Sequence, residues 1–122
     1  MRKILLLLLL ILISCNKEEF SKFDSIKKYN FGKAKVGDTI KYKFKLKNIA
    51  DKPLEIYNIG TSCSCTGAII SDSIIEKNNY ATILVSYVPT TQNVGSVKNS
   101  IVVEANTNPI FTTLYLEGII EK

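Results

Sequence analysis

The sequence predicts an all-β protein, a single antiparallel β-sandwich of about seven strands that follows a short targeting segment. From about Asp24 onward, apolar residues recur at every second position instead of with the 3.6-residue period of a helix. Turn-forming residues such as Gly, Asn, Asp and Pro separate these alternating runs at short intervals. A chain of 122 residues has room for one such domain.

The first fourteen residues have the composition of a signal peptide. Met1, Arg2 and Lys3 form a basic start, and an unbroken apolar run follows from Ile4 to Ile13. Ten residues rise about 15 Å as a helix, which is about half of a hydrocarbon core, so the run is too short to span a membrane. It also lacks the polar stripe of a helix buried in a small domain. We therefore expect residues 1–14 to be removed on export.

A cysteine stands directly after this run. Leu12-Ile13-Ser14-Cys15 resembles the bacterial lipobox. The resemblance implies cleavage before Cys15, a diacylglyceryl thioether on its sulfur and an acylated new amino terminus, and several acyl chains are what stable anchoring needs. The alternative is an ordinary secreted protein in which Cys15 is free or disulfide-bonded. With lipidation, residues 15–23 are a lipidated cysteine and a polar tether, and residues 24–122 form the domain.

The tether and the net charge bear on location. Asn16-Lys17-Glu18-Glu19 resembles a Lys-then-two-acids tag that directs lipoproteins of one Gram-negative lineage to the outer face of the outer membrane, the alternative being a solvated spacer. We expect an outer-membrane lipoprotein of the cell envelope, periplasmic or surface-exposed. Once Arg2 and Lys3 have left with the signal peptide, 14 lysines stand against 11 acidic residues. This small excess in an exported protein argues against nucleic-acid binding.

The clearest predicted strand covers residues 39–47. Its apolar residues face one way and four lysines face the other, as in a strand with one buried and one solvated face. We interpret the lysine row as a solvated face that discourages edge-to-edge aggregation, because no aromatic residue is interleaved with it. Docking on anionic lipid or polysaccharide is the alternative. The row consists of Lys41, Lys43, Lys45 and Lys47.

Six further runs alternate in the same way and are predicted to be strands: Ile26–Phe31, Leu54–Thr61, Thr66–Ile70, Ala81–Val88, Val97–Ala105 and Phe111–Ile120. Nothing between them is long and periodic enough for a helix. The inward positions predict a core of Phe31, Ile40, Tyr42, Phe44, Leu46, Leu54, Ile56, Ile59, Ile83, Val85, Tyr87, Ile101, Val103, Leu114 and Leu116.

Several motifs along the domain together resemble one known family. They are Phe31-Gly32, Phe44 to Asn48, Pro53-Leu54-Glu55-Ile56, Ser62-Cys63-Ser64-Cys65-Thr66 and Leu116-Glu117-Gly118. In this order they resemble the bacterial lipoprotein family named domain of unknown function 1573, with Ser64 in place of the usual glycine. The resemblance covers Asp24 to Lys122 and implies a Hydin-like immunoglobulin-type domain. Such domains are mostly scaffolding and binding modules, and the family has no established activity to transfer.

Cys63 and Cys65 are the only thiols left after lipidation. In an extended strand their Cα atoms would lie roughly 6.5–7 Å apart, whereas a disulfide prefers about 5.5–6 Å, so an internal bond requires a turn. Three interpretations remain open: a packed structural pair, a reducible disulfide favoured by oxidising conditions outside the cytoplasm, and a soft-metal site for Cu(I). Two cysteines alone do not complete a tetrahedral metal site.

The composition limits the chemistry. The chain has no histidine, and its one methionine is the first residue, so the mature protein lacks the usual general base and the Cys–His pair of thiol enzymes. We expect no enzyme and no cofactor. The predicted function is a lipid-anchored envelope protein whose domain is structural or binds a protein or glycan partner. The alternative is a thiol-based redox or copper-handling lipoprotein that uses Cys63 and Cys65.

Three short motifs predict covalent modification. Asp24-Ser25-Ile26, Asp38-Thr39-Ile40 and Asp72-Ser73-Ile74 resemble the Asp-Ser/Thr-aliphatic sites of a general bacterial O-glycosylation system. Turn chemistry is the alternative, since Asp followed by Ser or Thr is common where strands begin. We name Ser25, Thr39 and Ser73 the candidate glycan acceptors.

Overall fold

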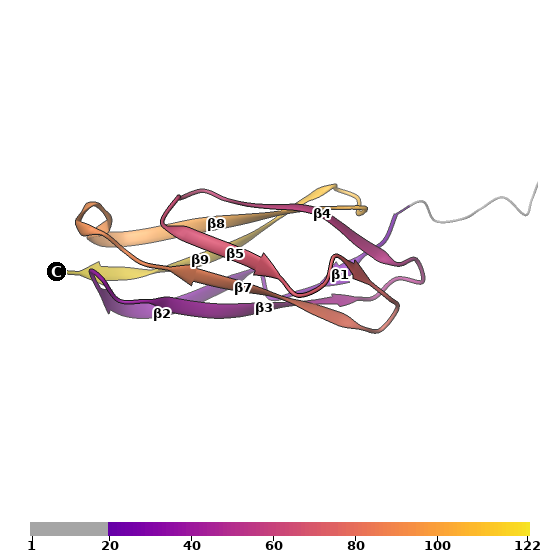
Figure 1. Cartoon of the computed structure of the whole chain (residues 1–122), viewed down its shortest axis with the longest axis horizontal. Coiled ribbons are helices and arrows are strands. Elements are labelled where there is room, and N and C mark those ends of the chain that lie inside the picture. Colours follow the sequence, from indigo (N-terminus) through magenta and orange to yellow (C-terminus); the bar gives the residue numbers. More distant parts are fainter. Residues whose placement is uncertain (1–19) are drawn as a thin grey trace, which may run out of the picture.

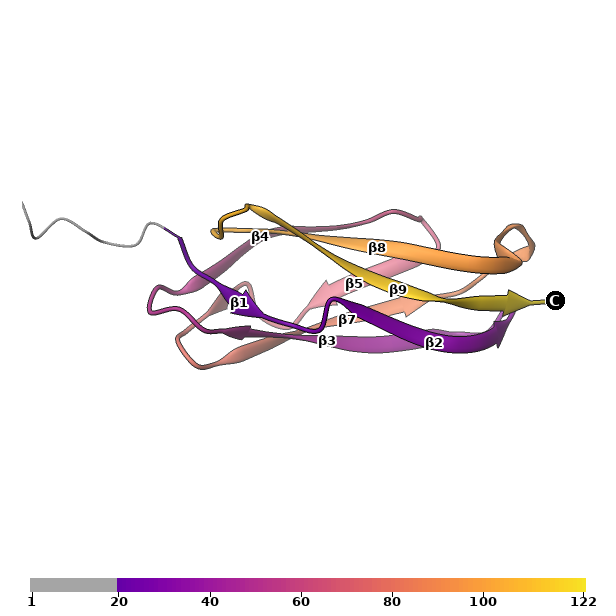
Figure 2. The same ribbon diagram turned by 180° about the vertical axis from the view of Figure 1, so that it is seen from behind.

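A computed structural model describes residues 20–122 as two packed β-sheets, which confirms the predicted immunoglobulin-like sandwich. The signal peptide, Cys15 and the Lys-Glu-Glu tag lie outside the described residues. Figures 1 and 2 show an elongated molecule in which the chain enters at one end of the long axis and the C-terminus lies at the other. No helix in residues 20–122 is long and apolar enough to cross a membrane.

The first sheet has four strands and the second has five. In spatial order the first contains β1 (Phe23–Asp24), β3 (Ile40–Asn48), β7 (Tyr80–Tyr87) and β5 (Thr66–Ile70). The second contains β2 (Lys28–Lys35), β9 (Phe111–Glu121), β8 (Gly95–Ala105), β4 (Leu54–Thr61) and β6 (Ile74–Ile75). A single 3₁₀ turn, η2 (Thr91–Asn93), is the one helical element in the described part of the chain.

Among the strands, one pair departs from a purely antiparallel sandwich. The chain leaves the first sheet after Asp24 and joins the second, where β2 runs parallel to β9. The register of this pair shifts between Asn30 and Lys33, and Gly32 there has φ +78°. Glycine adopts that conformation without steric cost, which permits the bulge. Alternation within a single strand does not reveal the direction of its partner, so the parallel pairing of β2 with β9 could not be predicted from the sequence.

Two of the predicted strands have the observed bounds, β4 and β5, and the other five differ at their ends by a few residues. β1 and β6 were missed because two-residue strands show no alternation. The predicted domain boundary at Asp24 is too late. Ser21 and Phe23 are already buried, and Ser21 N donates to Asn106 O at 2.8 Å.

The core lies between the sheets and contains most of the predicted residues. Of those predicted, eleven are buried, while Phe31, Ile40, Tyr42 and Ile59 are partly buried at its margin. Tyr42 stacks on Tyr29 with ring centroids 3.8 Å apart, so its ring closes the side of the sandwich where β2 meets β3. The prediction omitted five buried apolar residues, namely Phe23, Ile75, Ala81, Ala105 and Ile120.

Candidate functional site

Cys63 and Cys65 lie in the connection that carries the chain from β4 in one sheet to β5 in the other. Their sulfurs are joined in a disulfide, with the Cα atoms 5.2 Å apart. The turn that such a bond requires is present, because Thr66 N donates to Cys63 O at 3.1 Å. Both cysteines are partly buried, and Cys65 packs against the core. We call residues 61–66 the Cys-x-Cys turn.

Threonines at both ends hold this turn. The Thr61 hydroxyl is shared between the carbonyl oxygens of Cys63 and Thr66, at 3.2 and 3.1 Å. Cys65 O accepts from Val88 N at 3.2 Å, which fixes the turn to the end of β7. The Cys-x-Cys turn therefore sets where the edge strand β5 begins.

Three buried polar groups have no hydrogen-bond partner: the hydroxyl of Thr66, at the end of the turn, the hydroxyl of Tyr87, which is paired with Thr66, and the side-chain amide nitrogen of Asn99. Burial raises the pKa of Tyr87 above its ordinary value of 10.0. Residues 20–122 contain no group of three or more His, Cys, Asp or Glu side chains that could hold a metal ion. With the sulfurs bonded to each other, two thiolates for Cu(I) exist only after reduction.

The register of β5 determines which of its main-chain groups are unpaired. Ser71 N donates to Thr82 O at 2.9 Å, and Thr66 pairs with Tyr87. Hydrogen-bonded and non-hydrogen-bonded pairs alternate along an antiparallel ladder. The main-chain groups of Gly67 and Ile69 therefore point to β7, and those of Thr66, Ala68 and Ile70 point away from it. Since the Cys-x-Cys turn satisfies Thr66, Ala68 and Ile70 form an open edge.

Ile69 lies between Ala68 and Ile70, and its apolar side chain is largely exposed to solvent. Ile69 is 71% exposed on the outer face of the first sheet, where it is paired with Leu84. No residue of β5 carries a charge. This edge could not be recognised from the sequence, since only the pairing shows that β5 has a single neighbour.

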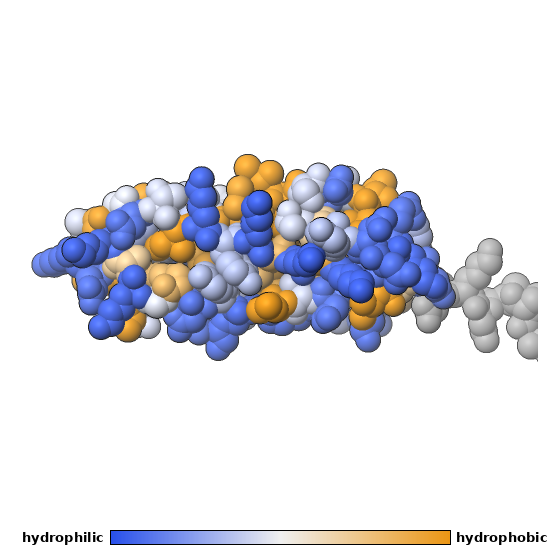
Figure 3. Space-filling view, turned by 90° about the horizontal axis from the view of Figure 1, so that it is seen from below, coloured by the Kyte–Doolittle hydropathy of each residue, from blue (hydrophilic) through white to orange (hydrophobic). Residues whose placement is uncertain are grey.

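The lysine row lies exposed on the outer face of β3, as predicted. Figure 3 shows hydrophilic side chains over much of the face that β2 and β3 present. The expectation that no aromatic residue adjoins the row is wrong. Tyr80 is paired with Lys47, and Lys45 Nζ lies 3.9 Å from the centroid of the Tyr80 ring. Tyr80 comes from β7, so inspection of β3 alone did not reveal it.

The candidate glycan acceptors all lie outside the strands, next to the start or end of one. Thr39 and Ser73 are exposed and Ser25 is partly buried. One of the preceding aspartates has a turn role, because Asp38 Oδ2 accepts from Lys35 N at 2.8 Å. Modification of these residues stays a prediction.

Comparison with known families gives one clear result. Residues 22–120 match the family described as "Protein of unknown function (DUF1573)". The chain belongs to this family. Among curated proteins, none matches the sequence.

Solved structures similar to the DUF1573 domain show the fold. A protein of unknown function from Porphyromonas gingivalis W83 is 13% identical, with a TM-score of 0.76, over 88% of this chain and 50% of that one. The chain thus spans about half the length of that protein. The PapD-like domain 7 of human CEP192 is 12% identical, with a TM-score of 0.66, over 89% and 92% of the two chains. The secreted serine protease VesC from Vibrio cholerae is 11% identical, with a TM-score of 0.64, over 80% and 23%.

Proposed function

We propose that this chain is a lipid-anchored protein of the outer membrane, whose DUF1573 domain binds an envelope protein and catalyses no reaction. The observation that carries the binding role is the open, uncharged edge of β5. Unpaired main-chain donors and acceptors are complementary to another extended backbone, so the partner chemistry is a β-strand added to this sheet.

Comparison with the other edges of the sandwich singles out β5. β1 and β6 have two residues each. β2 carries three lysines and a bulge, and the part of β3 that β1 leaves uncovered carries Lys41, Lys43 and Lys45. Short strands, lysines and bulges are the usual protections against strand pairing. Of the four outermost strands in residues 20–122, namely β1, β2, β5 and β6, β5 alone is longer than two residues and carries neither a charge nor a bulge.

A photo-crosslinking amino acid at position 69, in cells that make the protein, tests the binding role. We expect one adduct with another envelope protein, and no such adduct from the same probe at Val94, which is exposed beside η2. Ile69→Lys, probed at position 67, should abolish the adduct, while Ile69→Val should retain it. Because Ile69 is so exposed, both variants should stay within about 0.5 kcal/mol of wild-type stability. An adduct of two copies of this chain, or one that survives Ile69→Lys, would contradict the proposal.

The lipid anchor is tested separately. Intact-mass measurement of protein purified from membranes should show a chain that starts at Cys15 and carries the additional mass of acyl groups. The Cys15→Ala variant should lose that mass and leave the membrane fraction. An unmodified wild-type amino terminus would refute the anchor without affecting the test of β5.

A thiol-based function is the second candidate, and the disulfide is the observation that favours it. The bond closes between cysteines two residues apart in a partly buried turn. Reversible reduction would expose two adjacent thiols able to bind Cu(I). Thiol titration with and without reductant, followed by copper analysis of the reduced protein, tests it. Stoichiometric copper on reduced protein, absent from a Cys63→Ala, Cys65→Ala variant, would support this candidate over the first.

A further inference from the structure

We infer that the end of the domain next to the tether rests on the membrane that holds the lipid on Cys15, with apolar and basic side chains in contact with the interfacial layer. The inference depends on the lipid anchor of the proposed function. We define the tether end as residues 20–23, the β3–β4 and β6–β7 connections (residues 49–53 and 76–79), and the β8–β9 connection together with the first residue of β9 (residues 106–111).

Hydrogen bonds bring these four segments together. Ser21 N donates to Asn106 O at 2.8 Å, Ile49 N donates to Lys22 O at 3.0 Å, and Asn78 N donates to Asn48 O at 3.1 Å. In Figure 1 the β8–β9 connection and the described start of the chain lie at the same end, and the C-terminus lies at the other. The tether end is therefore one surface built from distant parts of the sequence.

Chain length limits how far this surface can be from the bilayer. Residues 16–19 separate Cys15 from Phe20. Five residue steps reach at most about 18 Å when fully extended. The interfacial region on each side of a bilayer is roughly 5–8 Å thick. With Cys15 lipidated at the edge of the hydrocarbon core, Phe20 can lie at most about 10–13 Å above the headgroup layer, and a tether that is not fully extended brings it closer.

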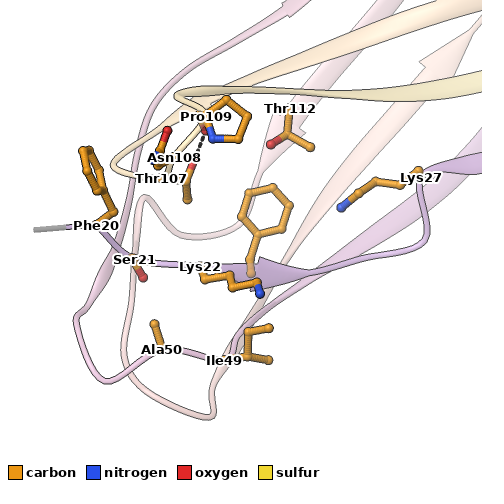
Figure 4. A pocket seen from close by; sticks show the side chains of 11 residues that line it. Phe20, Ser21, Lys22, Lys27, Ile49, Ala50, Thr107, Asn108, Pro109 and Thr112 are labelled. Atoms are coloured by element: carbon orange, nitrogen blue, oxygen red, sulfur yellow. Dashed lines mark hydrogen bonds between the residues drawn. The ribbon is translucent and has the colours of Figure 1, made fainter. Parts of the chain in front are cut away.

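Four large apolar side chains are exposed on the surface so confined. Phe20, Ile49 and Ile110 are 45–49% exposed, and Phe111, which begins β9, is 59% exposed. Figure 4 shows Phe20 and Ile49 around a hollow whose other wall is Pro109. Figure 3 shows hydrophobic side chains reaching the surface beside the entering chain. Aromatic and aliphatic side chains of this kind favour the boundary between headgroups and acyl chains.

The charged groups at this end add a small positive excess. The basic residues are Lys22, Lys52 and Lys77, with Lys27 at the rim of the hollow, and the acidic residues are Asp51 and Glu76. Asp51 pairs with Lys77 at 2.6 Å on the exposed surface. A net positive charge at this end favours contact with anionic lipid headgroups.

Buried amides make the tether end a fixed surface. The Asn48 amide donates to Lys52 O and Ile75 O at 3.0 and 2.9 Å and accepts from Ala50 N at 2.8 Å. The Asn106 amide accepts from Glu55 N at 2.8 Å and donates to Pro53 O at 3.0 Å. Because its connections are tied to the core, contact of this end with a membrane would orient the long axis of the whole domain away from the bilayer.

Tryptophan fluorescence can test this orientation, since the natural chain contains no tryptophan. The lipidated full chain would carry Phe111→Trp at the tether end or Val94→Trp at the far end. Each would be reconstituted into vesicles of phosphatidylcholine and phosphatidylglycerol with brominated acyl chains. We expect bromine to quench the Phe111→Trp protein several-fold more than the Val94→Trp protein. Adding Phe20→Asp and Ile49→Asp to the Phe111→Trp protein should lower that quenching.

Vesicle flotation and intact mass separate the possible failures. Protein that carries acyl mass and floats with vesicles, yet shows equal or no quenching at the two positions, would overturn the inference and leave the lipid anchor standing. Protein without acyl mass that does not float would overturn the anchor and the inference with it. Circular dichroism of the variant with all three substitutions must match wild type for its loss of quenching to count as support.

Discussion

Removal of the disulfide is the perturbation that best separates a structural role of the cysteines from a chemical one. In the variant with Cys63→Ala and Cys65→Ala, the unfolded chain loses a closed loop of only three residues. In the chain-entropy treatment of crosslinks, a loop of this length contributes about 1.5 kcal/mol. For a domain of about 100 residues this corresponds to a fall in Tm of about 6–12 °C.

We expect the loss of stability to arise from the greater freedom of the unfolded chain and from the start of β5. Thr66 N still has Cys63 O as an acceptor in the variant, because that hydrogen bond uses main-chain atoms. The Thr61 hydroxyl likewise contacts only carbonyl oxygens. We therefore expect a folded variant with the same far-ultraviolet circular dichroism spectrum, which retains the adduct through position 69 with reduced yield.

Thermal unfolding with and without reductant is the assay. Reductant should lower the Tm of the wild-type protein by about as much as the double substitution does, and it should leave the double variant unchanged. Detection of two free thiols in native protein that has not been treated with reductant would refute the disulfide. A Cys63→Ala protein with unchanged Tm that loses its cellular function would refute the structural role and make the thiol chemistry the leading function.

Three further outcomes are expected. A Cβ at Gly118 would overlap the Phe31 ring, so Gly118→Ala should lower the free energy of unfolding by about 1–3 kcal/mol in urea titrations. The matched control is Gly60→Ala, whose Cβ would meet nothing within 4 Å and should cause no such clash. Equal losses of unfolding free energy in the two variants would contradict the overlap. Burial raises the pKa of Tyr87, so its stabilising neutral form is complete below about pH 10 and is lost as the pH rises through the folded-state pKa. The Tyr87→Phe variant should therefore lack the loss of stability that wild type shows above pH 10, and its free energy of unfolding at pH 7 should be close to that of wild type. The same loss of stability above pH 10 in both proteins would count against this reasoning. Mass spectrometry of native protein should find glycan on at least one candidate glycan acceptor, and bare peptides at all three would refute that prediction.

Local patterns in the sequence determined the class of fold and most of the core. Alternation between lysines and apolar residues predicts both faces of β3, because successive side chains of a strand point to opposite sides of the sheet. The same period placed Phe44, Leu46, Ile83 and Val85 in the core, where they are buried. The Cys-x-Cys spacing likewise indicated that an internal disulfide needs a turn, and the structure has that turn.

Pairing between distant segments could not be predicted from the sequence, and the candidate functional surfaces depend on this pairing. Nothing within Thr66–Ile70 shows that β5 has one neighbour, so its open edge appears only when β7 is placed beside it. Tyr80 joins the lysine row from another strand. Phe20, Ile49 and Ile110 are isolated apolar residues in separate segments of the sequence, and hydrogen bonds between those segments gather them on one surface. A strand's own period reports which face is buried, whereas the identity of its neighbours is decided by packing of the whole sandwich.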